Sequence, residues 1–220
     1  MSKTFCISHL ILIRRNRGIK DMNYIYKKEF RDYYITYSLI LINLIMFILM
    51  TLAGGTTNYK VLIFFGAKVN PLIEAGQYWR LFTSMFIHIG FTHLLFNIYA
   101  LIALGKFTEH IFGHKKFVFI YLICGLSGSL LSYFFSPSIS AGASGAIFGL
   151  LGSLVGYGFR NSFLWQSGII TNLLIVLGIN LFFGFVFPGI DNFAHLGGLL
   201  SGIIIGFGLH LLRAKRQNFH

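Results

Sequence analysis

Residues 193–212 read FAHLGGLLSGIIIGFGLHLL, a run of twenty residues that contains no Asp, Glu, Lys or Arg. An α-helix needs about 20 apolar residues to cross a hydrocarbon core roughly 30 Å thick, and this run has that length. His195 stands near its start, where an imidazole at membrane depth is costly unless it has a partner. The stretch therefore predicts a membrane helix that carries a polar residue in a special environment.

The composition of the whole chain agrees with a membrane protein. Of the 220 residues, 55% are hydrophobic and 11% are charged, whereas a soluble domain carries about 25% charged residues. Apolar runs of near-spanning length are separated by polar or Gly/Pro-containing breaks. We expect membrane helices at about 34–53, 86–105, 117–135, 142–159, 169–187 and 193–212. The predicted fold class is an all-α membrane protein with six transmembrane helices.

These spans leave little chain for a separate soluble domain. We divide the sequence into a basic N-terminal tail, a membrane domain with a long loop, and a basic C-terminal tail: 1–33, 34–212 with the loop at about 54–85, and 213–220. No cleaved signal peptide is predicted, because the short apolar stretch near the start is interrupted by polar residues and followed by Arg14 and Arg15. Met1 and Met22 both stay open as the translation start.

The net charge of +12 follows the predicted topology. Fifteen of the 18 Lys and Arg residues fall in the two tails and in the connections 106–116 and 160–168, and three fall in the 54–85 loop. Because basic residues are enriched on the cytoplasmic side of membranes, both termini are predicted to be cytoplasmic. Nucleic-acid binding is not expected, since no basic patch alternates with base-stacking aromatic residues.

Four polar side chains fall at a similar depth under this topology. His93 and Asn97 lie near the start of the second predicted helix, Ser144 at the start of the fourth and His195 at the start of the sixth. All three helices run from the outer side inward, so these residues share one layer below the outer surface. Hydrogen bonding between helices is the plainer explanation for any one of them. Their combination favours chemistry.

Ser144 lies in Gly142-Ala143-Ser144-Gly145-Ala146, at the junction of an outer loop and a helix. A nucleophile needs an accessible hydroxyl, small neighbours that let a substrate approach, and N–H donors for an oxyanion. A helix N-terminus provides such donors and a favourable dipole. The motif differs from the G-x-S-x-G elbow of soluble hydrolases, which requires a preceding strand.

Small residues predict how His195 reaches Ser144. Gly198 and Gly202 lie on the face of His195 in its helix, and Gly145 and Gly149 form a matching row after Ser144. Helices with such faces approach closely, which brings His195 within hydrogen-bond reach of Ser144, roughly 3 Å. The imidazole is then placed as a general base.

Four further polar residues have candidate roles near this pair. His93 and Asn97 are four residues apart on one helix face, and both donate hydrogen bonds, so they are candidate oxyanion stabilisers. We expect a structural role for His88. Asp191 has two possible roles, as a third member that orients His195 or as a cap of the last helix.

Five motifs occur in an order that resembles one family: Trp79-Arg80, His93-x-x-x-Asn97, Glu109-x-x-x-Gly113, Gly142-Ala143-Ser144-Gly145 and Ala194-His195-x-x-Gly198-x-x-x-Gly202. Over residues 34–212 the chain resembles the rhomboid intramembrane serine proteases. The resemblance implies a dyad without a catalytic carboxylate, with Ser144 as nucleophile and His195 as general base and then acid. His93, Asn97 and the Ser144 N–H would form the oxyanion hole.

The resemblance also implies substrates and a location. Family substrates are single-pass membrane proteins cut in or beside a transmembrane helix with small residues near the cleavage point, and no metal or cofactor is implied. A bacterial cell membrane fits the six-helix form. The remaining motif residues, Trp79, Arg80, Glu109, Gly113, Gly142, Gly145, Gly198 and Gly202, are expected to be structural. Phe148 stands where the family often has a tyrosine stacked on the catalytic histidine.

The same residues leave one main alternative and argue against several other functions. The nearest alternative is an inactive rhomboid-like protein that binds membrane clients. A transporter would usually show paired halves or charges along a path, and the spans hold almost none. A metalloprotease H-E-x-x-H motif is absent, and His88, His93 and His195 have no carboxylate or cysteine at ligand spacing.

Two cysteines, Cys6 and Cys124, are too few for a disulfide framework.

Overall fold

The computed structural model describes residues 31–159, a few positions between 166 and 178, and residues 189–217, with side chains as far as Leu212 in the last range. Throughout these ranges the regular structure is helical, and the β pairing is limited to one isolated bridge between Lys68 and Ser140. The expected all-helical class is therefore confirmed for the described residues.

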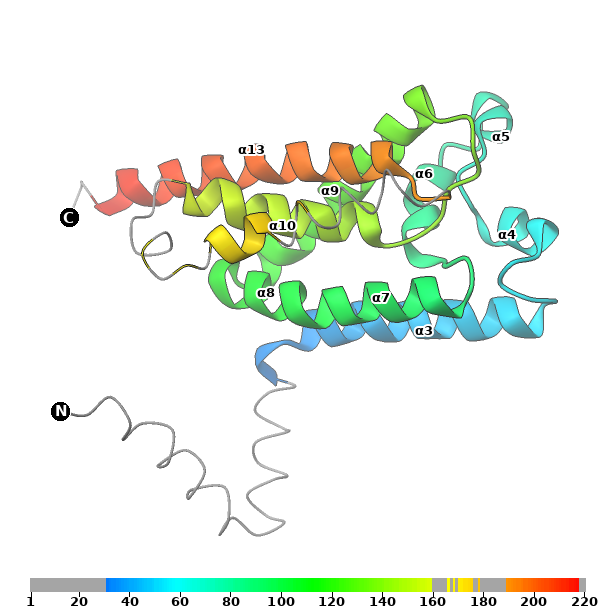
Figure 1. Ribbon diagram of the computed structural model, residues 1–220, viewed down its shortest axis with the longest axis horizontal. Coiled ribbons are helices and arrows are strands. Elements are labelled where there is room, and N and C mark those ends of the chain that lie inside the picture. The colour runs from blue at the N-terminus through cyan, green and yellow to red at the C-terminus, as the bar shows by residue number, and fades with distance from the viewer. Residues whose placement is uncertain are drawn as a thin grey trace, which may run out of the picture.

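Long helical segments run side by side along the bundle (Figure 1). Within the described ranges they are α3 (Tyr34–Leu52), a continuous segment made of α7 (Phe91–Ala100), the π-helix η2 (Leu101–Gly105) and α8 (Lys106–Phe112), then α9 (His114–Phe135), α10 (Ser144–Gly158) and α13 (Asn192–Gln217). Four of these segments are long and apolar enough to cross a membrane. The fifth, α10, is apolar but has 15 residues.

The second span lies later in the chain than the predicted 86–105. It begins at Phe91, after Gly90 at φ 80°, and continues to Phe112. The charges that suggested a loop are accommodated in the helix: Lys106 lies over the ring of Tyr37 at 5.1 Å, and Glu109 binds the start of α3. Of the predicted fifth span, 169–187, most residues lie outside the described ranges, and residues 170–175 are helical.

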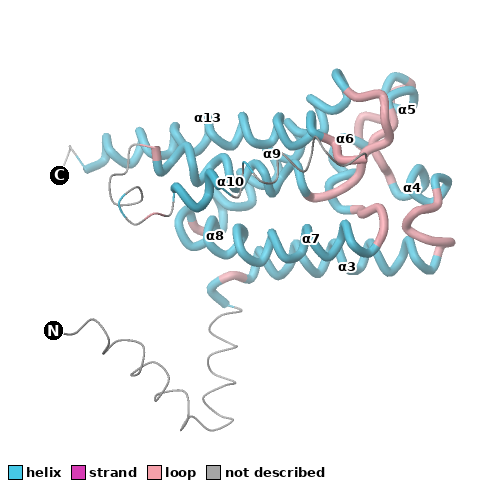
Figure 2. The backbone as a smooth tube through the Cα atoms, in the orientation of Figure 1, coloured by secondary structure: helices cyan, strands magenta, loops and turns pink. Residues whose placement is uncertain are grey.

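The predicted 54–85 loop is folded into short helices at one end of the bundle (Figures 1 and 2). These are α4 (Tyr59–Phe65), α5 (Asn70–Glu74), α6 (Arg80–Thr83) and the 3₁₀ turn η1 (Ser84–Phe86). Arg80 is buried among them, and its Nη1 donates to the carbonyls of Ile63 at 2.8 Å and Ala67 at 3.1 Å. Its guanidinium also lies 4.5 Å from the ring centre of Trp79. Arg80 thus closes the loop around carbonyls that would otherwise lack donors.

The closest packing in the described structure joins α10 and α13. Every residue of α10 from Gly145 to Gly158 is buried. A Cβ atom built on Gly198 would overlap the carbonyl oxygen of Gly145, and one on Gly202 would overlap that of Gly149. The two backbones are therefore in direct contact, as the rows of small residues predict. This contact carries the starts of both helices, where the candidate site lies.

Candidate active site

Ser144 is the first residue of α10, and the loop before it has a restrained geometry. The preceding Ala143 offers no capping side chain, so the N–H groups of the first turn are not capped by that residue. Gly142 adopts φ 142° and donates its N–H to the carbonyl of Ser84 at 2.8 Å. A Cβ on Gly142 would lie 2.7 Å from Cε1 of His93. Glycine therefore meets both a backbone and a space requirement at this position.

His195 lies in the first turn of α13 and is 8% exposed. The ring of Phe148 stacks on its imidazole with centroids 4.1 Å apart and planes 8° apart. Phe148 is four residues after Ser144 and shares its helix face, so the stack brings His195 to the side of α10 that carries the serine. The backbones also meet here, since a Cβ on Gly145 would lie 3.3 Å from the Ala194 carbonyl oxygen. The ring stack expected at Phe148 is present.

Asp191 acts as the cap of α13. Its Oδ1 accepts a hydrogen bond from the Ala194 N–H at 3.0 Å, and its Oδ2 accepts one from the Ser132 hydroxyl. The buried Nδ1 of His195 has no hydrogen-bond partner among the described residues. Of the two roles considered for Asp191, the structure shows the capping role, and the imidazole is held by ring stacking and helix packing.

His93 and Asn97 lie one turn apart on α7, beside the loop that precedes Ser144. The His93 ring packs against Gly142. The Asn97 side chain is buried, and its Nδ2 donates one hydrogen bond to the His93 carbonyl at 2.9 Å. An amide nitrogen carries two protons, so this bond uses one of the two donors of Asn97. The arrangement brings His93 to the serine loop and keeps Asn97 on the adjoining turn.

His88 contacts the same loop and the ring of His93. Its Nε2 accepts a hydrogen bond from the Ala143 N–H at 3.4 Å, and its ring lies edge-on to His93 with centroids 5.3 Å apart. Burial, and then the neighbouring His93, lower the pKa of His88 to about 3. The neutral imidazole that this shift favours is the form that accepts a hydrogen bond. The contact agrees with the structural role expected for His88.

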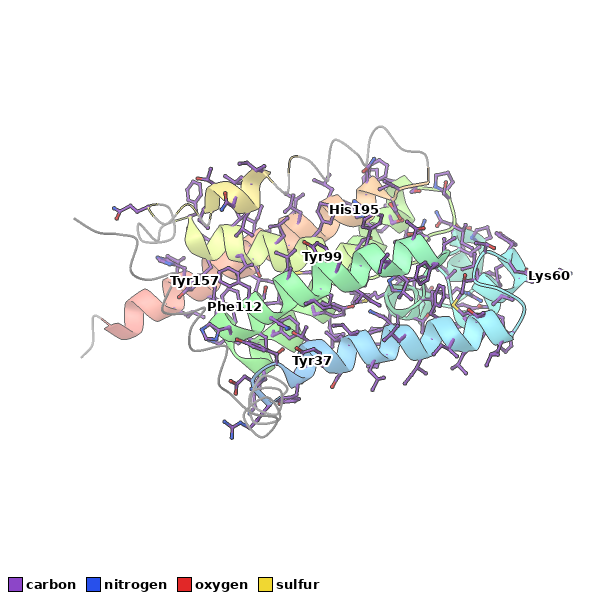
Figure 3. The ribbon with its side chains drawn as sticks, turned by 60° about the horizontal axis from the view of Figure 1, so that its bottom comes forward. Tyr37, Lys60, Tyr99, Phe112, Tyr157 and His195 are labelled. Carbon is purple, nitrogen blue, oxygen red and sulfur yellow. The ribbon has the colours of Figure 1, made fainter. Side chains whose placement is uncertain are left out.

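Glu109 and Gly113 belong to a different part of the molecule. The buried Glu109 carboxylate accepts hydrogen bonds from the N–H groups of Ile35 and Thr36, at 3.2 and 3.0 Å, and so caps α3. Gly113, at φ 76°, separates α8 from α9. In Figure 3 their neighbour Phe112 lies to the left of His195, whereas Lys60 lies at the right-hand end of the bundle. These motif residues stabilise the bundle and do not join the site.

Sequence reasoning missed the polar residues of the outer loop that bind the serine loop. Lys68 is fully buried and binds backbone carbonyls of the α9–α10 connection. Ser84 accepts the hydrogen bond of Gly142 through its carbonyl. A lone lysine between Ala67 and Val69, in a loop with few charges, was a signal for Lys68. Ser84 acts through its backbone, which no side-chain pattern reveals.

Metal ligation has no support in the described part of the chain. Among those residues, no group of three or more His, Cys, Asp or Glu side chains could hold an ion. Cys124 is a buried free thiol on α9, packed where Gly149 of α10 approaches it. Cys6 lies outside the described residues.

The comparisons with known proteins agree with the fold. The Rhomboid domain profile matches residues 75–212. The chain is 45% identical over 179 residues to the rhomboid protease GluP of Bacillus subtilis (strain 168), which covers 81% of this chain and 35% of that protein. It is 40% identical over 147 residues to RHOMBOID-like protein 4 of Arabidopsis thaliana, and the match covers 66% of this chain and 37% of that protein. It is 36% identical over 157 residues to Rhomboid-like protease 1 of Toxoplasma gondii, and the match covers 67% of this chain and 52% of that protein.

The chain therefore belongs to the rhomboid family. Its apolar helices and this membership make it an integral membrane protein. The matched region spans about a third to a half of the length of these relatives.

Proposed function

We propose that this chain is an intramembrane serine endopeptidase in which Ser144 is the nucleophile and His195 the general base. The observation that carries the proposal is the parallel stack of Phe148 on His195 at 4.1 Å, one helical turn from Ser144. Similarity to a protein named as a rhomboid protease supports the same activity. Helix association alone would not require a buried imidazole that stacks one helical turn from a serine at a helix N-terminus.

The proposed reaction is acyl transfer through a covalent intermediate. The Ser144 hydroxyl oxygen attacks the scissile carbonyl while its proton passes to the ring nitrogen of His195. When the tetrahedral intermediate collapses, the imidazolium gives this proton to the leaving amide nitrogen, and the acyl-enzyme remains on Ser144. A water molecule, deprotonated by His195, then attacks the acyl carbonyl, and the imidazolium returns the proton to the Ser144 oxygen as the acid product leaves. No metal or cofactor takes part in these steps.

The oxyanion would be stabilised by donors at the start of α10 and on α7. The Ser144 N–H belongs to an uncapped first turn, where the helix dipole favours negative charge. The His93 ring touches Gly142, and Asn97 keeps a second amide proton beyond its bond to the His93 carbonyl. Donors fixed in place before reaction lower the barrier without reorganisation. We assign the three groups to the oxyanion hole.

The proposed topology has six spans, with 169–187 as the fifth and both termini in the cytoplasm. Ser144 and His195 then lie below the outer surface of a bacterial cell membrane. The substrates are single-pass membrane proteins that are cut near small residues, because small side chains let a backbone reach the serine. The basic residues at both ends of the chain support this orientation.

The test compares the full chain, reconstituted with a labelled single-pass substrate, with Ser144→Ala and His195→Ala. Ser153→Ala on α10 and His210→Ala on α13 are matched controls, because each alters the same residue type farther along the same helix. We expect each dyad variant to lose about 10³-fold or more in cleavage rate, and the controls to keep it. Normal cleavage by both dyad variants would refute the assignment. A wild type inactive on several substrates would favour a client-binding protein without protease activity.

A further inference from the structure

Lys68 is a fully buried lysine outside the proposed dyad. It lies between α4 and α5, and its Nζ donates to the carbonyls of Ser136 at 2.7 Å and Ser138 at 3.0 Å. Its backbone also pairs with Ser140, with N–H to carbonyl distances of 2.8 and 3.1 Å. A charged side chain is seldom fully buried unless it is paired. The partners here are backbone carbonyls of the loop that leads to Ser144.

Asn70 strengthens the same attachment. Its Nδ2 donates to the carbonyls of Tyr133 at 2.9 Å and Ser136 at 3.2 Å. Because α9 ends at Phe135, these oxygens belong to the carbonyls that a helix C-terminus leaves unsatisfied. A cation at this end is also favoured by the helix dipole. Together, Lys68 and Asn70 join the outer loop to the end of α9 and to the following loop through six hydrogen bonds.

Lys68 also interacts with Asp191, the residue that caps the helix of His195. Burial lowers the pKa of Lys68, and the Asp191 carboxylate opposes this shift by favouring the charged ammonium. Asp191 caps α13, which carries His195, and accepts a hydrogen bond from Ser132 of α9. The ammonium therefore binds the loop before Ser144 and lies in the field of the residue that caps the helix of His195.

We propose that Lys68 is a positioning residue, whose buried ammonium group fixes the 136–143 loop and thereby the reactive geometry of Ser144. The proposal rests on the function proposed above. Ser140, which pairs with Lys68, lies two residues before Gly142. A shift of this loop therefore moves Gly142, which contacts His93, and it also moves the start of α10. Displacement by about 1 Å reduces catalysis roughly 10²-fold. Lys68 would act through the loop, without touching substrate.

The experiment measures the reaction of Ser144 with a fluorophosphonate probe, together with kcat, KM and the thermal midpoint, in the full chain. Lys68→Met keeps the length of the side chain and removes the donors. Lys60→Met is the matched control, since Lys60 is an exposed lysine of the same outer loop. Asn70→Ala removes the hydrogen bonds to the carbonyls of Tyr133 and Ser136, of which Ser136 is also bound by Lys68, and it leaves Lys68 in place.

We expect Lys68→Met to lower the probe rate and kcat by roughly tenfold to a hundredfold at a temperature where it is folded, with KM within about twofold. Asn70→Ala should show a smaller loss of the same kind, and Lys60→Met none. Wild-type rates in folded Lys68→Met would overturn the inference. If Lys68→Met does not fold, wild-type probe reactivity in Asn70→Ala would overturn it. A wild type that neither reacts with the probe nor cleaves would instead refute the proposed protease function, and the inference with it.

Discussion

Two regions hold the candidate site, and they are built in opposite ways. The α10–α13 contact is made of backbone on backbone, because glycines at 145, 149, 198 and 202 let the helices touch. The outer loop is held by long polar side chains, chiefly Lys68 and Arg80, that bind carbonyls. The helix contact requires residues that have no Cβ atom, whereas the outer loop requires side chains that donate hydrogen bonds. We expect additions to break the first region and removals to break the second.

Of the variants that test this comparison, the largest effect should come from adding one methyl group to the helix contact. In Gly198→Ala the new Cβ would overlap the Gly145 carbonyl, one residue from Ser144. Overpacking costs about 1–3 kcal/mol, and forcing α13 away from α10 should lower cleavage roughly 10²-fold. Gly208→Ala on the same helix is the control, since no atom lies within 4 Å of its built Cβ. Equal activity of the two variants would contradict the backbone contact.

Removal of the Arg80 guanidinium should lower stability more than reactivity. Arg80→Gln leaves the carbonyls of Ile63 and Ala67 without their buried donor, at about 1–3 kcal/mol for each unsatisfied group. The thermal midpoint should fall clearly, while folded protein keeps most of its probe reactivity. Gln77→Ala, which removes one partner of Arg80 and keeps both carbonyl bonds, should cost less. An Arg80→Gln variant as stable as wild type would show that the loop has other supports.

A smaller effect is expected at the ring stack. Phe148→Leu keeps an apolar side chain but removes the ring that lies parallel to His195. Aromatic pairs contribute about 0.5–1.5 kcal/mol beyond area burial, so kcat should fall by roughly twofold to tenfold with little change in KM. Phe148→Tyr restores the ring face and should keep the wild-type rate. A loss in Phe148→Tyr as large as that in Phe148→Leu would argue against stacking as the cause.

The smallest effect on cleavage is expected at His88, where the change concerns stability in acid. Because its folded pKa is about 3 and an unperturbed histidine titrates near 6.5, protonation favours the unfolded chain. This contribution is complete above pH 6.5 and is lost as the pH falls toward 3, by up to about 1.4 kcal/mol per pH unit. His88→Gln cannot titrate, so its unfolding free energy should fall less than that of wild type between pH 6 and 4. Parallel pH curves would contradict a buried neutral His88.

Prediction from sequence succeeded where one local property decides the structure. The apolar runs predicted the four helices that are long enough to cross a membrane, because length and hydropathy suffice to predict them. The second span was placed too early, because Lys106 and Glu109 look like loop residues until their partners on α3 and the tail before it are known. Short helices in the 54–85 loop went unpredicted, since they depend on Arg80 reaching carbonyls far along the chain.

The sequence by itself determined the class of protein, the all-helical apolar architecture, the small-residue rows and the motif residues of the family. The tertiary structure decided which partners those residues have. It gave Asp191 to the cap of α13, stacked Phe148 on His195 and placed Lys68 and His88 against the loop before Ser144. The physical reason is that hydropathy and helix periodicity are properties of neighbouring residues. A hydrogen bond or a ring stack between distant residues exists only once the backbone brings the two groups within a few ångströms.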